Sequence, residues 1–280
     1  MVFGKLFGGS KRREPDDPDR PSLRPMEMGD VPRVLHIIAQ TDEDDAEAAE
    51  RMFASARSIK NMFVLWYQNQ IVGVTGYGAS EGDDNVVWLS WTYIDEDARG
   101  DGLGGFMVEE LLGLLNRRRV RKLFISTSDY AEDGVLIYAA AHAFYEQLGA
   151  KIELTLPDFY GEGEARIIYG LDNPGMAKPE SFEGLGERGC VFFDVGEDDE
   201  AEDVGVASWE ETEDGSVDGV DRLLGIAHSR EYRALVVALP ADISDMATGQ
   251  LEETGFERIG ILSDFYALEL GQVWWMRHLA

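Results

Sequence analysis

A glycine-rich stretch, residues 99–105, constrains this chain more than any other feature of its sequence. The residues before it, 85–94, have the pattern of a half-buried strand, and residues 102–118 have apolar positions at helical spacing. Glycine lets the backbone adopt positive φ and lets a ligand approach closely. Because the N–H groups of the first helical turn carry the positive end of the helix dipole, the stretch is predicted to bind phosphate groups.

The charge balance argues against one class of ligand. Of the 280 residues, 54 are acidic and 25 are basic, which gives a formal net charge of −29. Such a surface repels phosphate backbones, so we expect no general binding of nucleic acid. It attracts cationic substrates, but the acidic residues are spread over nearly every loop rather than gathered at one place. We therefore interpret the composition as an adaptation to concentrated salt, which screens repulsion between surface charges.

The sequence has no apolar run of about eighteen residues, so we expect no membrane span. Residues 1–21 lack the long apolar core and the cleavage site of a secretory signal and are predicted to be a disordered tail. The single cysteine, Cys190, excludes a disulfide within the chain, which favours a cytoplasmic location. Cys190 opens an apolar run and is predicted to be a core residue. The histidines show no metal-ligand spacing, so no metal is expected.

Hydrophobic periodicity divides the chain from residue 22 to residue 171 into strands and helices. Helices are predicted at residues 31–38, 44–59, 102–118 and 136–148. Strands are predicted at residues 22–27, 62–68, 71–77, 85–94, 123–126, 150–156 and 165–171, with a loop at 157–164 between the last two.

This order of elements and two motifs resemble the GNAT superfamily of N-acetyltransferases. Arg99, Gly102 and Gly104 match the family's Arg/Gln-x-x-Gly-x-Gly/Ala motif. Residues 144–150, Phe-Tyr-Glu-Gln-Leu-Gly-Ala, match its Phe-Tyr-Glu-x-Leu-Gly-Phe motif except at the last position. The resemblance covers residues 23–172 and implies an α/β (α+β) fold, in which a mixed, mostly antiparallel sheet is flanked by helices.

The resemblance also implies a cofactor, acetyl-CoA, and the residues that hold it. The pyrophosphate of the cofactor lies on the glycine turn, and its pantetheine arm runs along the preceding strand. Tyr138 stands where many members carry an asparagine that contacts the cofactor, and Tyr145 matches the family's general acid, whose reference pKa of about 10 suits donation to a thiolate. The implied cofactor-binding residues are Thr92, Tyr93, Ile94, Arg99, Gly100, Asp101, Gly102, Leu103, Gly104, Gly105 and Tyr138.

The general base that many members carry on a central strand is missing from this chain. Neither residues 86–91 nor residues 123–127 contain a glutamate or a histidine, which leaves a water relay through Ser90, Ser126 or backbone carbonyls. An acceptor that loses its proton easily needs no strong base. An α-amino group, with a pKa of about 7.7–8.0, meets this condition better than a lysine, at about 10.4.

The loop at residues 157–164 resembles the acceptor loop of GNAT enzymes that modify protein N-termini. This likeness places Phe159 and Tyr160 beside the acceptor amine. The alternative is an aromatic hairpin that packs against the core, because the aromatic pair recurs later in the chain, at Phe265 and Tyr266.

The second half of the chain repeats part of the first. Residues 254–256 and 264–266 repeat residues 148–150 and 158–160 at an offset of 106. Two further segments, 223–226 and 235–237, repeat 111–114 and 123–125 at an offset of 112. The copy of the glycine turn falls at residues 211–216, which hold one glycine and three carboxylates. The predicted domains are therefore a tail (1–21), a catalytic domain (22–174), a linker (175–187) and a degenerate GNAT-like domain (188–280). The last domain is predicted to be truncated, because it lacks copies of the first two helices.

The sequence thus predicts an acetyl-CoA-dependent N-acetyltransferase whose acceptor is a primary amine of a small molecule or a peptide. The finer hypothesis is that this amine is the N-terminus of a protein or peptide. The second half either replaces the partner subunit of a GNAT dimer, so that the chain is a monomer with an internal pseudo-dimer, or forms a lid; a homodimer is the other arrangement considered. The alternative function is a non-catalytic acyl-CoA-binding module with a regulatory or interaction role.

Overall fold

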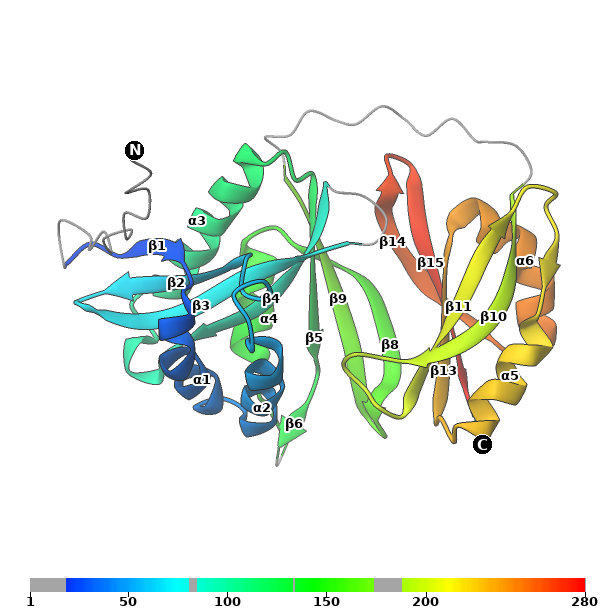
Figure 1. Ribbon diagram of the computed structural model, residues 1–280, viewed down its shortest axis with the longest axis horizontal. Coiled ribbons are helices and arrows are strands. Elements are labelled where there is room, and N and C mark those ends of the chain that lie inside the picture. The colour runs from blue at the N-terminus through cyan, green and yellow to red at the C-terminus, as the bar shows by residue number, and fades with distance from the viewer. Residues whose placement is uncertain (1–18, 81–84, 133, 174–187, 280) are drawn as a thin grey trace, which may run out of the picture. The chain divides into compact units, whose positions relative to one another are not determined.

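The computed structural model describes residues 19–80, 85–132, 134–173 and 188–279 (Figure 1). These residues form two compact units, one made of residues up to Gly76 with Trp91–Leu111, and one made of Tyr77–Ser90 with residues from Leu112 onward. The predicted linker and the predicted tail up to residue 18 lie outside the described residues. The predicted domain boundaries divide the chain differently from these units and stay a prediction.

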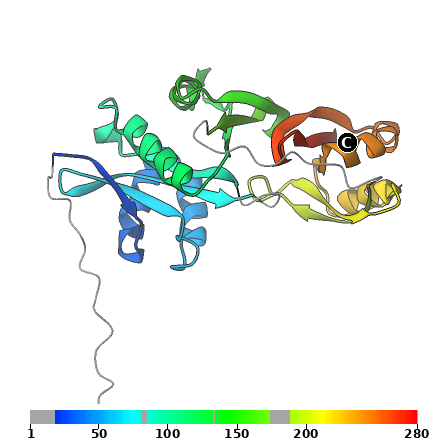
Figure 2. The same cartoon turned by 90° about the horizontal axis from the view of Figure 1, so that it is seen from above.

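The first unit is a sheet with helices on both faces, as Figure 2 shows. Val34 and Ile37 of helix α1 pack with helix α2 on one face of the sheet, and Met107 of helix α3 packs on Leu65 and Val72 from the other. The strands follow the order β1-β2-β3-β4. The elements are β1 (Ser22–Pro25), α1 (Val31–Ala39), α2 (Glu43–Met52), β2 (Met62–Tyr67), β3 (Gln70–Ala79), β4 (Val86–Ile94) and α3 (Leu103–Arg117), of which β3, β4 and α3 continue into the second unit.

The prediction of a helix over residues 44–59 is wrong in its second half, because α2 ends at Met52. Beyond it, the Ser58 hydroxyl donates to the Ser55 carbonyl (2.8 Å), and the Ser58 N–H donates to the Ser55 hydroxyl (3.3 Å). Serine side chains that bond nearby backbone groups in this way compete with the helical pattern.

In the second unit, β4 continues into the strand order β4-β5-β9-β8, with helix α4 following the short hairpin of β6 and β7. The register pairs Val86–Trp88 of β4 with Lys122–Phe124 of β5, in parallel. These elements are β5 (Lys122–Ser128), β6 (Ala131–Glu132), β7 (Val135–Leu136), α4 (Ala139–Gln147), β8 (Lys151–Gly161) and β9 (Glu164–Asp172).

The predicted loop at residues 157–164 is mostly strand. Strand β8 extends to Gly161, which pairs directly with Glu164, so the turn between β8 and β9 has only two residues. Gly163 occupies that turn at φ 80°, a conformation that glycine adopts without steric cost. The helix predicted from residue 136 begins later, at Ala139, because the residues before it form the hairpin β6–β7.

The rest of the second unit repeats the strand order of the first half of the chain. Strands β10-β11-β13-β15-β14 follow one another as β3-β4-β5-β9-β8 do. Strands β11, β13, β14 and β15 begin 118, 112, 106 and 106 residues after β4, β5, β8 and β9. The elements are β10 (Gly189–Glu197), β11 (Val204–Thr212), β12 (Val217–Asp218), α5 (Val220–Ser229), β13 (Ala234–Pro240), α6 (Ala241–Glu253), β14 (Glu257–Ala267) and β15 (Leu270–His278).

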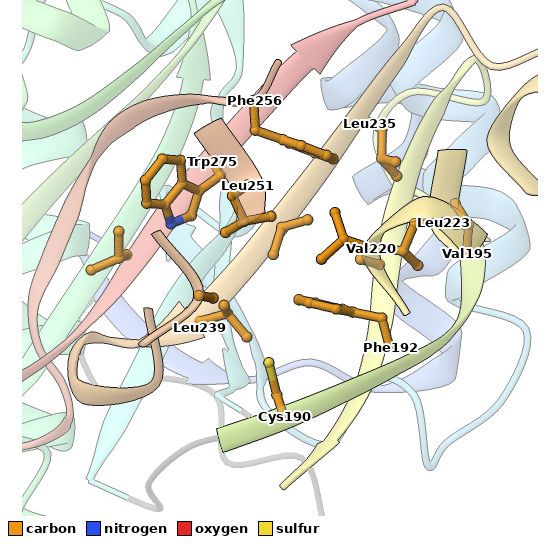
Figure 3. Close-up of a cluster of buried hydrophobic side chains, with 14 of the residues drawn as sticks. Cys190, Phe192, Val195, Val220, Leu223, Leu235, Leu239, Leu251, Phe256 and Trp275 are labelled. Carbon is orange, nitrogen blue, oxygen red and sulfur yellow. The ribbon is translucent and has the colours of Figure 1, made fainter. Parts of the chain in front are cut away.

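Helices α5 and α6 close a core of their own on this second sheet (Figure 3). Phe192, Leu223 and Trp275 meet in it, and the indole N–H of Trp275 donates to the Ser244 hydroxyl (2.9 Å). Cys190 is fully buried in the same core, which confirms its predicted place. Burial raises the pKa of the Cys190 thiol to about 12, so the group stays a neutral, unreactive thiol at neutral pH.

The two sheets of the second unit share a further core, which contains Phe159 of β8 and Phe265 of β14. Two arginines secure it in a reciprocal way. The Arg121 guanidinium donates to the carbonyls of Asp264 and Phe265, and the Arg233 guanidinium donates to the carbonyls of Asp158 (2.5 Å) and Phe159 (2.8 Å). Each arginine therefore satisfies carbonyls of the opposite sheet at equivalent positions of the repeat.

Within the described parts of the chain, no helix combines the length and the apolar character needed to cross a membrane.

Replacing Arg233 with methionine is expected to lower the free energy of unfolding by about 2 kcal/mol, because two carbonyls lose their donor. Urea or thermal unfolding measures the change. The matched control is Arg222→Met, at an exposed arginine of α5, where a change within about 0.5 kcal/mol is expected. Equal losses in the two variants would contradict the assigned role of Arg233.

Candidate active site

The glycine turn has the geometry of an anion-binding site. Gly100 and Gly102 adopt φ values of 92° and 75°, and helix α3 begins immediately afterwards, at Leu103. The first N–H groups of a helix have no partner within it. A Cβ atom placed on Gly100 or Gly102 would meet no heavy atom within 4 Å, so the turn faces open space. The residues present therefore fit a phosphate-bearing cofactor.

In the second half, helix α5 begins after Gly219, and residues 211 and 212, where the copy of the glycine turn is predicted to start, belong to β11. A Cβ atom on Gly219, which precedes α5, would lie 2.3 Å from the carbonyl oxygen of Phe192. The side chains around it include three carboxylates, those of Asp218, Asp221 and Glu253, and one guanidinium, that of Arg222. This excess of negative charge disfavours a phosphate group at the start of α5.

Arg99 braces the turn from within the first unit. Its guanidinium donates to the carbonyl of Ile94 (Nε, 3.1 Å) and to the hydroxyl of Thr41 (Nη2, 2.8 Å). The buried carboxylate of Asp95 accepts from the Asp97 N–H (3.0 Å) and pairs with Arg33. The end of β4 and the start of the turn are thus fixed by side chains.

Strand β4 is irregular just before the predicted cofactor contacts. Trp91 has a φ of 47°, which is rare for a residue with a side chain and typical of a bulge. The Thr92 and Thr75 hydroxyls lie 2.9 Å apart, and the Tyr93 hydroxyl donates to Asp45. These side chains bond within the first unit, so a cofactor arm would meet the backbone of β4. No local pattern predicts this positive φ, because tryptophan does not favour the conformation.

The predicted residues from Thr92 to Gly105 all belong to the first unit, whereas the other predicted site residues belong to the second. Tyr145 lies on α4 and is 8% exposed, with its ring 5.9 Å from that of Tyr169. Burial, with a smaller effect of Tyr169, raises the pKa of the Tyr145 phenol to about 12. The group therefore keeps its proton at neutral pH. Tyr138 precedes α4 and is half-buried.

Phe159 and Tyr160 of β8 contact the second half of the chain. Phe159 is fully buried in the core shared by the two sheets. The Tyr160 hydroxyl donates to Glu200 (2.5 Å), and burial, followed by the charge of Glu200, raises the pKa of this phenol. These contacts support the packing alternative for Phe159, while Tyr160 takes part in a polar network.

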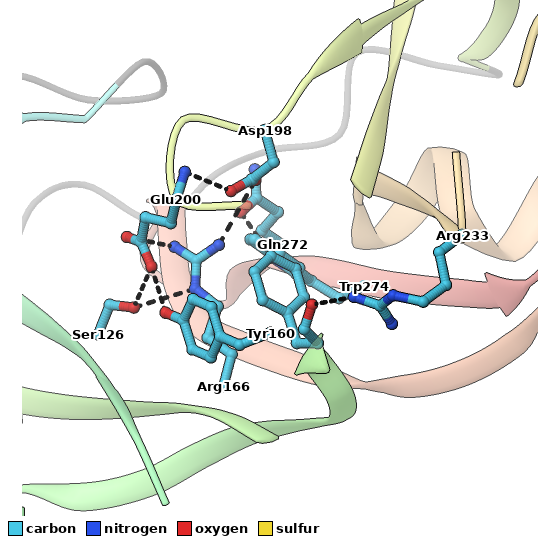
Figure 4. A network of polar contacts seen from close by, with 9 residues as sticks. Ser126, Tyr160, Arg166, Asp198, Glu200, Arg233, Gln272 and Trp274 are labelled. Atoms are coloured by element: carbon cyan, nitrogen blue, oxygen red, sulfur yellow. Dashed lines mark hydrogen bonds and ion pairs between the residues drawn. The ribbon is translucent and has the colours of Figure 1, made fainter. Parts of the chain in front are cut away.

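The centre of this network is a buried guanidinium, that of Arg166 on β9 (Figure 4). Its Nη2 donates to Glu200 (2.9 Å), its Nε donates to the Ser126 hydroxyl (3.0 Å), and its Nη1 lies 3.6 Å from Asp198. The ring of Trp274 lies 5.7 Å from the guanidinium carbon, a cation–π arrangement. Both carboxylates come from the connection between β10 and β11. Sequence reasoning missed them because no motif marks this connection.

In the ranges that the structure describes, no group of three or more histidine, cysteine, aspartate or glutamate residues is placed to hold a metal ion.

The open glycine turn at the start of α3 fits a protein that binds a phosphate-bearing cofactor. Residues 58–149 match a family model described as an acetyltransferase (GNAT) domain. The chain therefore contains a GNAT acetyltransferase domain, and the predictions of this fold, of an acetyltransferase enzyme and of acetyl-CoA as its cofactor are confirmed.

Several solved structures are similar in fold to about half of this chain. The ribosomal-protein-S18-alanine N-acetyltransferase of Escherichia coli is 20% identical, with 59% of this chain and all of that chain covered and a TM-score of 0.45. The ribosomal-protein-alanine N-acetyltransferase of Brucella melitensis is 21% identical, with 54% and 99% covered and a TM-score of 0.45. An N-acetyltransferase of Staphylococcus aureus is 16% identical, with 55% and 99% covered and a TM-score of 0.45. No curated protein sequence matches the chain.

Replacing Gly102 with alanine is expected to weaken acetyl-CoA binding about tenfold or more, because the added methyl group enters the space in front of the turn. The rise in melting temperature on adding acetyl-CoA measures this binding. Gly163→Ala is the matched control, since Gly163 also has positive φ (80°) and open space. Both variants bear a similar backbone strain of about 1–2 kcal/mol. An unchanged acetyl-CoA response in Gly102→Ala would contradict the assignment.

Proposed function

We propose that this enzyme transfers the acetyl group of acetyl-CoA to a primary amine, and that the amine is the N-terminus of a protein or peptide. The observation that carries the proposal is the open glycine turn at the start of α3, which the second half lacks. Bound acetyl-CoA supplies a thioester. The N–H groups of the turn would bind the cofactor's pyrophosphate, and the backbone of β4 after Trp91 would bind its arm.

Tyr145 is the general acid in this proposal. Its phenol is neutral over the whole physiological range, since its pKa is raised to about 12. Tyr145 would donate its phenol proton to the sulfur as the amine nitrogen displaces it from the thioester carbonyl. The nitrogen would release one proton to solvent, and the Tyr145 oxygen would regain one, so that the products are an amide and a free thiol. The buried position of Tyr145 excludes competing water from the proton that it holds.

The nature of the acceptor follows from the missing base. Strand β4 from Val86 to Trp91 and strand β5 from Leu123 to Thr127 carry no side chain that accepts a proton well at neutral pH. An α-amino group is substantially neutral at a pH near its pKa of about 7.7–8.0, so it reacts without such a base. The acceptor is therefore expected to be an N-terminal α-amino group rather than a lysine side chain.

The second half acts as a built-in partner subunit in this proposal. The reciprocal contacts of Arg121 and Arg233 support it, because each arginine binds the carbonyls that its equivalent offers in the other sheet. Such reciprocity is typical of an isologous interface between two identical chains. One chain would then be a monomer that contains its own pseudo-dimer.

Replacing Tyr145 with phenylalanine is expected to lower kcat about 100-fold and to leave the KM for acetyl-CoA nearly unchanged, because only proton donation is lost. Thiol release over a panel of N-terminal peptides and lysine-bearing amines gives both constants. Tyr169→Phe, at the neighbouring buried tyrosine, is the control and should change kcat less than about threefold. Full activity in Tyr145→Phe would contradict the role of Tyr145 as general acid. Efficient acetylation of lysine side chains with poor acetylation of N-termini would contradict the proposed class of acceptor.

A wild-type protein that binds acetyl-CoA and acetylates no amine of the panel would favour the second candidate, a regulatory acyl-CoA-binding module. This second candidate is supported by the absence of a glutamate or histidine from residues 86–91 of β4 and 123–127 of β5.

A further inference from the structure

We propose that Glu200, contributed by the second half of the chain, binds the amine of the acceptor. The proposal rests on the proposed function, since it names the group that recognises the acceptor of that reaction. It also gives the second half a role in substrate recognition, although this half has no cofactor turn of its own.

Glu200 contacts β5, a strand that has no glutamate of its own from Leu123 to Thr127. It precedes β11, and its Oε2 accepts from the hydroxyl of Ser126 on β5 (3.0 Å). Ser126 is two residues beyond Phe124, the last residue of β5 that the register pairs with β4. On its other side Ser126 pairs with Ile168 of β9. A carboxylate from elsewhere in the chain thus reaches the part of β5 that follows its pairing with β4.

Three side chains fix the Glu200 carboxylate in place. The Tyr160 hydroxyl (2.5 Å) and the Ser126 hydroxyl (3.0 Å) donate to Oε2, and the Arg166 guanidinium (2.9 Å) donates to Oε1. A carboxylate accepts about four hydrogen bonds, so these donors leave about one position on Oε1. The Glu200 side chain is 40% exposed. A ligand that donates a hydrogen bond therefore has access to a rigidly held anion.

The charge of the network favours a cation. One guanidinium, that of Arg166, faces two carboxylates, those of Asp198 and Glu200. Asp198 is 12% exposed and lies 3.6 Å from Arg166, so its charge is directed to the buried guanidinium. The negative charge in excess is therefore presented at Glu200. An α-ammonium group combines the positive charge and the N–H donors that this position accepts, and it becomes the nucleophile after it releases a proton to solvent.

Glu200 also explains the position of Tyr160. The resemblance of residues 157–164 to an acceptor loop predicts this tyrosine beside the acceptor amine, and its hydroxyl bonds directly to Glu200. The tyrosine acts through that bond as a positioning residue, which holds the carboxylate while Glu200 meets the amine.

The test compares Glu200→Gln with Asp198→Asn in the full-length protein. Both variants remove one carboxylate from Arg166, but only Glu200 is accessible to a ligand. Glu200→Gln is expected to raise the KM for an N-terminal peptide about tenfold or more, the loss typical of a hydrogen bond to a charged group, and to leave the KM for acetyl-CoA within about twofold. Asp198→Asn is expected to leave both KM values within about twofold. Circular dichroism and the melting temperature show that each variant is folded.

Glu200→Asp is the second variant, because it keeps the charge and shortens the side chain by one methylene. It should show a KM for the peptide between those of the wild type and Glu200→Gln. An unchanged peptide KM in Glu200→Gln, or equal increases in Glu200→Gln and Asp198→Asn, would overturn the proposal and leave a structural contact. A wild-type protein without turnover on any amine would instead overturn the proposed function, and this inference with it.

Discussion

The second unit depends on the burial of two aromatic hairpins in one core. Strands β8 and β14 bring Phe159 and Phe265 together, so that the face of one sheet is covered by the other. When these faces are buried, the backbone carbonyls beside each phenylalanine lose their hydrogen bonds to water and need another donor. Arg121 and Arg233 solve it by donating across the interface. The apolar core and the hydrogen bonds to the buried carbonyls thus lie at the same place, and each half of the chain contributes one phenylalanine and one arginine.

The two halves share a strand order but differ at the start of one helix. The start of α3 faces open space at Gly102, whereas a Cβ atom on Gly219, before α5, would meet the Phe192 carbonyl. The first half has the turn that we propose to hold the cofactor. The second half keeps the strands that build the shared core, and it adds the connection that carries Glu200. The second half therefore has a structural role that does not depend on a cofactor site of its own.

The sequence predicts the regular parts of this architecture well, because periodicity and glycine positions report local physics. The strand β4, the helix α3 and the burial of Cys190 follow from these signals. Tertiary contacts decide the rest. Residues 157–161 contain a proline and an aspartate, which are typical of a loop, yet β8 continues through them because Phe159 packs between two sheets. Trp91 has a positive φ that no local pattern predicts. The hydrogen bond between Ser126 and Glu200 joins residues that are distant in sequence, so no local pattern predicts it either.

The central claim is that each chain binds one acetyl-CoA, at the glycine turn of the first half. Isothermal titration calorimetry of the full-length protein with acetyl-CoA tests it most directly, because the method counts sites. The account predicts a single class of site with a stoichiometry of about one per chain. A stoichiometry of about two, with heat from a second site in the second half, or no binding at all, would contradict it.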